Sequence, residues 1–213
     1  MTDPKSKSGG GKSGGAKPPV AKAAGGATSA TKPTSGAKHD PAKPAAEAAA
    51  DPCATAGVAG PEHEVLKAFE GTWKAAVSFW MQPGVPPIHA EGTMLNEWIL
   101  GGRFLQQRYS SEFMGSPFAG QGLFGYNNVD RRYEGLWADT MSTAMMLETG
   151  RYDASLRTFT MTGEVTEPGS RKTMHKKTVI TVDSPDQHTM SMHFADENAK
   201  NYWKCMEIVY TRK

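Results

Sequence analysis

The feature that most constrains this chain is a series of strand-like segments, separated by turn signals, that runs from residue 71 to the end. Most segments are longer than an average strand of five or six residues, and short loops join them. Long strands joined in this way favour an all-β, up-and-down antiparallel barrel of about ten strands over a Greek-key sandwich. The ten predicted strands are residues 72–81, 89–100, 103–113, 118–126, 133–139, 143–152, 156–167, 172–182, 188–195 and 202–211.

One short helix is expected just before the first strand. Residues 63–70 place Val65, Leu66 and Phe69 on one apolar face, with Pro61 near the start. Within the strand series, Gly101-Gly102 is a two-residue hairpin signal, because both glycines can adopt a positive φ.

The first sixty residues have a different composition, with no Phe, Trp, Tyr, Ile or Leu. Such a segment cannot bury enough apolar surface to offset the entropy of ordering its backbone. We therefore predict a disordered tail over residues 1–60 and one folded domain over residues 61–213. The tail holds eight lysines and four acidic residues, a net charge of +4; since the whole chain carries +2, the domain carries −2.

A lysine-rich tail can contact nucleic acid by releasing counterions. No arginine or aromatic residue is interleaved with these lysines, which favours a solubilising extension instead. The start of the chain lacks the apolar core of a secretory signal, and no apolar stretch reaches the length that crosses a bilayer. The two cysteines, Cys53 and Cys205, form neither a disulfide framework nor a metal knuckle. These features predict a cytoplasmic protein that does not insert into membranes.

Several stretches resemble known barrel proteins. Gly71-Thr72-Trp73 resembles the Gly-x-Trp signature of calycin barrels, which include lipocalins, fatty-acid-binding proteins and bacterial relatives. A longer series of matches resembles the bacterial family catalogued as domain of unknown function 1579. The resemblance covers about residues 63–212 and implies a lipocalin-like barrel without an established activity. Its matching stretches are residues 97–105, 118–122, 125–127, 137–143, 150–153 and 207–212.

The best candidate for a site lies on the predicted strand 133–139 and the turn after it. By alternation, Trp137, Asp139 and Met141 share one face of the strand with Tyr133 and Gly135. If this face lines the barrel, Asp139 is a polar group that orients a ligand within an aromatic pocket. Alternatively, Asp139 caps the following turn through its side chain. Alternation does not tell which face is inside.

Aromatic and methionine side chains extend the candidate site to other strands. Methionine is flexible and polarizable, so a methionine-lined cavity adapts to varied apolar guests. Eleven methionines follow the initiator, although core packing is the alternative reason for any one of them. The residues that this argument adds as ligand contacts are Trp73, Trp98, Tyr126, Met190 and Met192.

Arg103 follows the paired glycines and is a further candidate contact, because its guanidinium group can bind a carboxylate or phosphate with two donors. Two alternatives stay open: Arg103 extends along the barrel rim, or it pairs internally with Glu97, Asp139 or Glu207.

No catalytic motif, cofactor motif or metal-ligand spacing occurs, so we predict no catalytic residue, cofactor or metal. The function predicted is non-catalytic binding of a small apolar or aromatic molecule inside the barrel. One alternative is a haem- or gas-binding barrel resembling the nitrobindins, in which His193 is the candidate haem ligand. The other alternative is a filled barrel that presents its surface to a protein partner.

Overall fold

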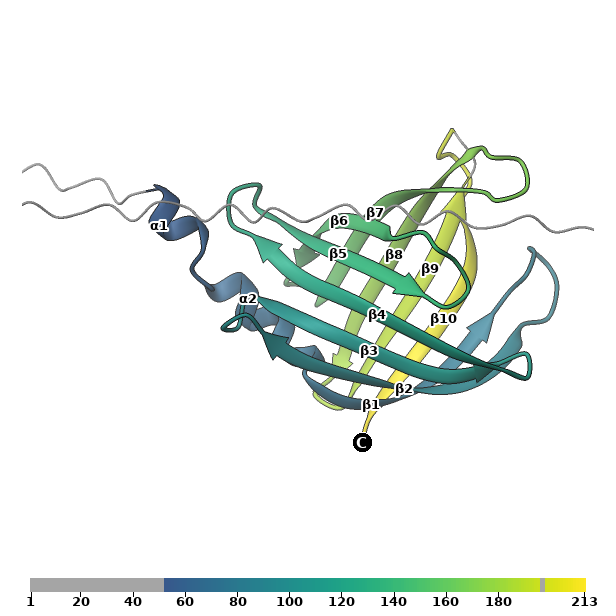
Figure 1. Ribbon diagram of the computed structural model, residues 1–213, viewed down its shortest axis with the longest axis horizontal. Coiled ribbons are helices and arrows are strands. Elements are labelled where there is room, and N and C mark those ends of the chain that lie inside the picture. The colour runs from purple at the N-terminus through teal and green to yellow at the C-terminus, as the bar shows by residue number, and fades with distance from the viewer. Residues whose placement is uncertain (1–51, 196–197) are drawn as a thin grey trace, which may run out of the picture. The chain divides into compact units, whose positions relative to one another are not determined.

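The predicted architecture is confirmed. A computed structural model of the chain describes residues 52–195 and 198–213, and in these residues ten antiparallel strands form one closed barrel (Figure 1). Each strand pairs with its neighbours in the sequence, and the first strand also pairs with the last. The strands are β1 (Gly71–Phe79), β2 (Ile88–Ile99), β3 (Phe104–Phe113), β4 (Ser116–Asn127), β5 (Arg132–Asp139), β6 (Met146–Asp153), β7 (Thr158–Thr166), β8 (Thr173–Ser184), β9 (Gln187–Ala195) and β10 (Trp203–Arg212).

The barrel closes where β1 pairs with β10. The register runs from Trp73 opposite Arg212 to Phe79 opposite Met206, so seven residue pairs join the two ends of the sheet. Because every backbone edge is then paired, the sheet leaves no exposed edge strand. Closure also gives each strand an inner and an outer face: in β1, Trp73, Ala75 and Val77 are buried while the residues between them are exposed.

Short helices cover one end of the barrel. The predicted helix forms as the α-helix α2 (Pro61–Val65) followed by the 3-10 helix η1 (Leu66–Phe69). His63 Nδ1 accepts a hydrogen bond of 3.1 Å from the Gly60 N–H, which fixes the first turn of α2. Leu66 and Phe69 are buried in the core, as the apolar face of the predicted helix requires. The Tyr133 hydroxyl on β5 donates to the Glu62 carbonyl at 3.0 Å and holds the helix on the barrel.

The last residues of the predicted tail include some regular structure. Residues 52–60 fall within the segment predicted to be disordered, and they include a short helix, α1 (Pro52–Ala56). This segment is held by hydrogen bonds rather than by apolar burial, which composition could not reveal. The Asn128 amide in the β4–β5 turn donates to the carbonyls of Thr55, Ala56 and Val58. Residues 1–51 lie outside the described residues, and the boundary between tail and domain stays a prediction.

The turn at the paired glycines is longer than expected. Ile99 pairs with Phe104, so four residues connect β2 to β3 instead of two. Gly101 and Gly102 have φ values of 68° and 78°, as the hairpin signal requires, but Leu100 also adopts a positive φ of 50°. The Gly102 N–H donates to the Ile99 carbonyl at 3.1 Å and closes the turn.

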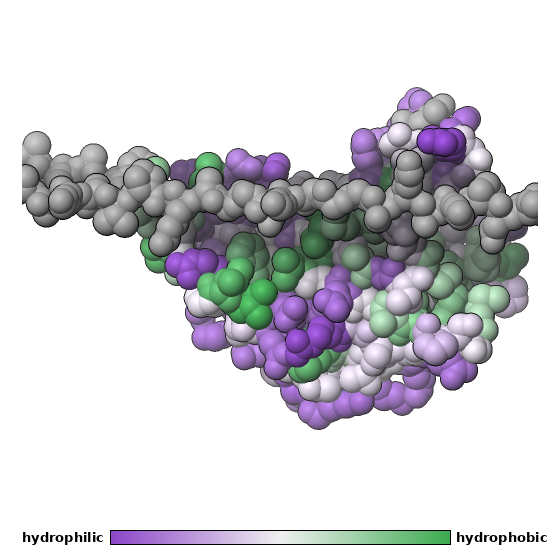
Figure 2. All heavy atoms as spheres, viewed as in Figure 1, coloured by the Kyte–Doolittle hydropathy of each residue, from purple (hydrophilic) through white to green (hydrophobic). Residues whose placement is uncertain are grey.

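The two ends of the barrel differ. At the end that we call the plugged end, α2 and η1 lie beside the turns at residues 100–103 and 128–131 (Figure 1). The opposite end, which we call the open end, carries longer loops, including residues 80–87 and 140–145. Figure 2 shows hydrophilic side chains among the hydrophobic ones across the visible outer face, in contrast to the largely apolar interior. No helix in the described part of the chain is long and apolar enough to span a bilayer.

Candidate functional site

The barrel contains a cavity of about 390 Å³. Each of the ten strands contributes to its lining, and Phe69 of η1 closes it at the plugged end. At the open end the lining includes Met141, whose side chain is 68% exposed, so the cavity reaches the surface beside the β5–β6 loop. A ligand can therefore enter from the open end and extend towards the helical plug.

Most of the cavity wall is apolar. It contains aromatic side chains from five strands and seven methionines, together with small aliphatic residues. Methionine side chains can change rotamer at low cost, so such a wall adapts to ligands of different shape. The methionines in the lining are Met94, Met141, Met146, Met161, Met190, Met192 and Met206.

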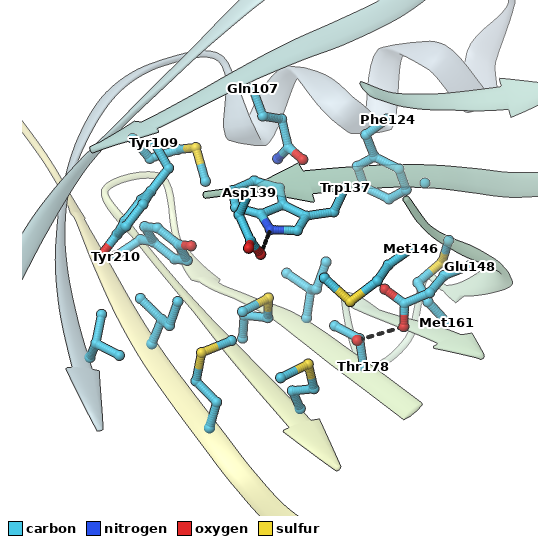
Figure 3. Close-up of a pocket in the computed structure, with 18 of the residues that line it drawn as sticks. Gln107, Tyr109, Phe124, Trp137, Asp139, Met146, Glu148, Met161, Thr178 and Tyr210 are labelled. Atoms are coloured by element: carbon cyan, nitrogen blue, oxygen red, sulfur yellow. Dashed lines mark hydrogen bonds between the residues drawn. The ribbon is translucent and has the colours of Figure 1, made fainter. Parts of the chain in front are cut away.

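Trp137 on β5 is the tryptophan that lines this cavity (Figure 3). Its indole lies against Gly120 of β4, where an added Cβ atom would stand only 2.2 Å from a ring carbon. A similar Cβ atom at Gly122 would stand 3.0 Å from the ring. Both glycines thus leave the space that lets the ring pack against the sheet. The indole N–H donates to Asp139 Oδ2 at 2.9 Å, which fixes the orientation of the ring.

Asp139 caps the turn after β5, as one of the two alternatives predicted, and it also lines the cavity, while a role in orienting a ligand stays a prediction. Its carboxylate lines the cavity, and Oδ2 accepts the hydrogen bond from Trp137. Its other oxygen, Oδ1, accepts a hydrogen bond of 2.9 Å from the Met141 backbone N–H and so shapes the turn after β5. One side chain therefore caps the turn and orients the aromatic wall. The inner face of β5 is the face that carries Gly135, Trp137 and Asp139.

A buried ion pair forms a polar patch on the neighbouring part of the wall, where Glu148 of β6 stands opposite Gly135 of β5 in the register. Lys176 Nζ on β8 lies 2.9 Å from Glu148 Oε2 on β6, and their side chains are only 6% and 14% exposed. The Thr178 hydroxyl donates to Glu148 Oε1 at 2.7 Å (Figure 3). Both carboxylate oxygens therefore have partners. Lys176 and Thr178 lie 28 and 30 positions from Glu148 in the sequence. The patch therefore depends on strand register, and no local pattern in the sequence predicts it.

A second polar group lies at the plugged end around the Phe69 carbonyl. This oxygen accepts hydrogen bonds from Trp73 Nε1 at 2.8 Å and from Asn96 Nδ2 at 2.7 Å. The His188 ring packs beside them, with its centroid 4.4 Å from that of Trp73 and 4.5 Å from that of Tyr210. Asn96 and His188 both line the cavity, and sequence reasoning missed both.

Two polar atoms of this group have no hydrogen-bond partner. Asn96 Oδ1 and His188 Nδ1 are buried and unpaired in the described structure. Burial, together with the positive charge of Arg212 as the smaller cause, lowers the pKa of His188 from 6.5 to about 3. The imidazole is therefore neutral at physiological pH.

The structure brings five of the predicted site residues together around the cavity. Trp137 and Asp139 stand on β5, Met141 in the following loop, and Met190 and Met192 on the inner face of β9. Their role in binding a ligand stays a prediction, because geometry alone does not test it.

Four other predicted contacts lie outside the cavity lining. Trp73 is fully buried in the barrel wall, and Trp98 packs against the core around Leu66. Tyr126 packs on Tyr133 with ring centroids 4.9 Å apart. All three aromatics stand near the plugged end, where they pack the core instead of facing the open space.

Arg103 also lies outside the lining and is exposed. Its Nε donates to the Gly57 carbonyl at 2.6 Å and its Nη1 to the Leu100 carbonyl at 3.0 Å. It therefore links the segment before α2 to the β2–β3 turn. This role differs from the predicted ligand contact and from the predicted ion pairs with Glu97, Asp139 or Glu207.

His193, the candidate haem ligand, directly follows Met192, whose side chain lines the cavity. Because side chains alternate along a strand, His193 lies on the outer face of β9. Its register partners are Lys177 and Lys204. Burial and the charge of Lys177 lower the pKa of His193. Within residues 52–195 and 198–213, no group of three or more His, Cys, Asp and Glu side chains could hold a metal ion.

Comparison with known proteins gives a family and a fold. The family described as "Protein of unknown function (DUF1579)" matches residues 58–212. The crystal structure of Rv2717c from M. tuberculosis is similar at a TM-score of 0.53 and 15% identity, covering 73% of this chain and 99% of that chain. The S-type phycobiliprotein lyase CPES from Guillardia theta has a TM-score of 0.48 and 10% identity, covering 70% and 91%. No curated protein matches the sequence. At this level of identity, the likeness to Rv2717c concerns the fold alone.

Proposed function

We propose that this chain, which belongs to the DUF1579 family of proteins of unknown function, binds a small, largely apolar or aromatic molecule inside its barrel. The observation that carries the proposal is the cavity of about 390 Å³ with its aromatic and methionine lining. Protein interiors are normally packed as densely as organic crystals. A cavity of this size, largely apolar and with a few convergent polar groups, has the composition of small-molecule sites.

The polar groups in the cavity support binding without chemical transformation. Both oxygens of Asp139 and both oxygens of Glu148 already accept hydrogen bonds from the protein. A carboxylate held in this way is poorly placed to take a proton from a substrate. The Cys205 thiol is buried and donates to the Met192 carbonyl, and burial raises its pKa to about 12, so it is not a thiolate at neutral pH.

The cavity also distinguishes this proposal from the protein-interaction alternative. A barrel that serves only as a surface would be filled by its own side chains, whereas here the space continues from Phe69 at the plugged end to Met141 at the open end. The haem alternative gains no support from His193, because this residue faces away from the cavity.

Native mass spectrometry tests the proposal. We expect gently purified protein to carry a bound molecule, or to gain one when challenged with fatty acids, terpenoids and aromatic compounds. Met192→Trp places a large ring in the cavity and should abolish the adduct. Ser191→Trp places the same ring on the outer face of β9 and should leave it. Bare protein under every challenge, or equal adducts in the two variants, would contradict the proposal.

A further inference from the structure

We propose that the ligand carries a neutral hydroxyl group and that Asn96 and His188 bind this group at the plugged end of the cavity. The inference rests on the proposed binding function and specifies the chemical class of the ligand: an apolar alcohol or phenol, and not a carboxylic acid or a pure hydrocarbon.

The orientation of the Asn96 amide is fixed by its surroundings. The Phe69 carbonyl can only accept hydrogen bonds, so the amide nitrogen must face it, as the 2.7 Å contact shows. The amide oxygen is then left without a donor, although the side chain is 2% exposed. A buried acceptor without a partner is costly, because it has lost its hydrogen bond to water. A ligand donor at this point would remove that cost.

His188 provides the second unpaired atom, and its ring also packs against Phe69. Its ring centroid lies 4.9 Å from that of Phe69, it is 5% exposed, and its Nδ1 has no partner. A neutral imidazole presents one nitrogen as a donor and the other as an acceptor, depending on the tautomer. A hydroxyl group both donates and accepts, so it satisfies both atoms in the tautomer with the hydrogen on Nδ1: its oxygen accepts from Nδ1–H and its hydrogen is donated to Asn96 Oδ1. An ether or a ketone, which only accepts, does not match the amide oxygen.

The charges of the lining disfavour an anionic head group. Lys176 is the one Lys or Arg residue among the lining residues, and its ammonium group is paired with Glu148 at 2.9 Å. Asp139 adds a second carboxylate, so the lining carries a net charge of −1. Arg212 lies outside the lining, where its guanidinium stacks on Trp73 at 4.1 Å and donates to backbone carbonyls. An apolar carboxylate would therefore meet no unpaired cation in the cavity.

The remaining wall suits the apolar body of such a molecule. From the plugged end towards the open end the lining continues through Ile208, Met190 and Trp137, which are aliphatic, thioether and aromatic groups. An alcohol with a flat or branched hydrocarbon body would place its hydroxyl at Asn96 and bury its body along these residues.

Three probes with one ring system test the inference on the full chain. We would titrate the protein by isothermal calorimetry at pH 7 with 2-naphthol, naphthalene and 2-naphthoate. We expect 2-naphthol to bind at least about tenfold more tightly than either of the others, as one or two hydrogen bonds in a buried site allow. Equal affinity for naphthol and naphthalene would overturn the hydroxyl site and leave the binding function standing. Tightest binding of naphthoate would overturn it in favour of Lys176 as an anion site.

Variants then locate the selectivity. His188→Phe keeps an aromatic ring between Trp73 and Tyr210 but removes Nδ1, so the preference for naphthol over naphthalene should fall several-fold. Thr189→Val, on the outer face of β9 beside it, should keep the preference. An unchanged preference in His188→Phe would contradict the role of this residue. Should that variant fail to fold, the comparison of the three probes on the unaltered protein decides the matter. If none of the three probes binds the folded protein, the hydroxyl site for an aromatic alcohol is refuted, and the binding function is decided by the wider set of fatty acids, terpenoids and aromatic compounds.

Discussion

Acidification should destabilise this protein through His188, and the structure gives the size of the effect. In the folded barrel the side chain lies against Phe69, Trp73 and Tyr210, and its pKa falls to about 3. In the unfolded chain the same imidazole has the ordinary pKa of 6.5. Between these two values the unfolded state binds a proton that the folded state does not. The free energy of unfolding is therefore fully retained above about pH 6.5 and falls as the pH drops towards 3.

One pKa unit of difference corresponds to about 1.4 kcal/mol. Two units of acidification below the unfolded pKa, to pH 4.5, should thus remove about 2–3 kcal/mol of stability through this one residue. For a domain of this size that loss lowers the melting temperature by roughly 5–10 °C.

Chemical denaturation at pH 7 and at pH 4.5 measures this contribution. The unaltered protein and His188→Phe share every other titrating group, so the difference between their pH dependences isolates His188. We expect the unaltered protein to lose about 2–3 kcal/mol more than the variant on acidification. If both proteins lose the same amount, His188 is not buried as a neutral group and the reasoning is refuted.

Two further substitutions test the cavity wall. Gly120→Ala pushes a Cβ atom into the Trp137 indole and should lower the free energy of unfolding by about 1–3 kcal/mol. Gly135→Ala, in the same lining but with 4.0 Å of clearance, should change it by less than about 1 kcal/mol; equal losses by denaturation would contradict the packing. Glu148→Met leaves Lys176 buried without a partner and should cost about 3–5 kcal/mol. Adding Lys176→Met should recover most of that loss, and a double variant as unstable as the single one would contradict the buried pair.

The barrel could be predicted from the sequence because its signals are local. The alternation within each strand and the Gly, Pro and Asn clusters between strands placed all ten strands within a few residues of their observed bounds. The prediction of a two-residue turn at Gly101 was wrong because Leu100 adopts a positive φ and also belongs to the turn. A leucine in the sequence does not predict a positive φ. The helix α1 was missed because its order depends on Asn128, more than seventy residues away.

In the candidate site, too, local interactions could be predicted and long-range ones could not. Trp137 and Asp139 could be found because they interact two residues apart on one strand. The pair of Lys176 and Glu148 could not, because it exists only once β6, β7 and β8 are in register. Alternation alone also does not distinguish an aromatic side chain that lines the cavity from one that packs the plugged end. Trp73 is an example of the second kind.

The binding of a ligand inside the barrel is tested most directly by the indole N–H resonances of the five tryptophans in a ¹⁵N-labelled sample. Of these residues only Trp137 lines the cavity, while Trp80, Trp98 and Trp203 lie outside it. Titration with 2-naphthol should therefore shift or broaden the Trp137 resonance most strongly and leave those of Trp80, Trp98 and Trp203 nearly unchanged. A silent Trp137 together with a shifted Trp80 or Trp203 would place the probe on the outside of the barrel and contradict a ligand site within it.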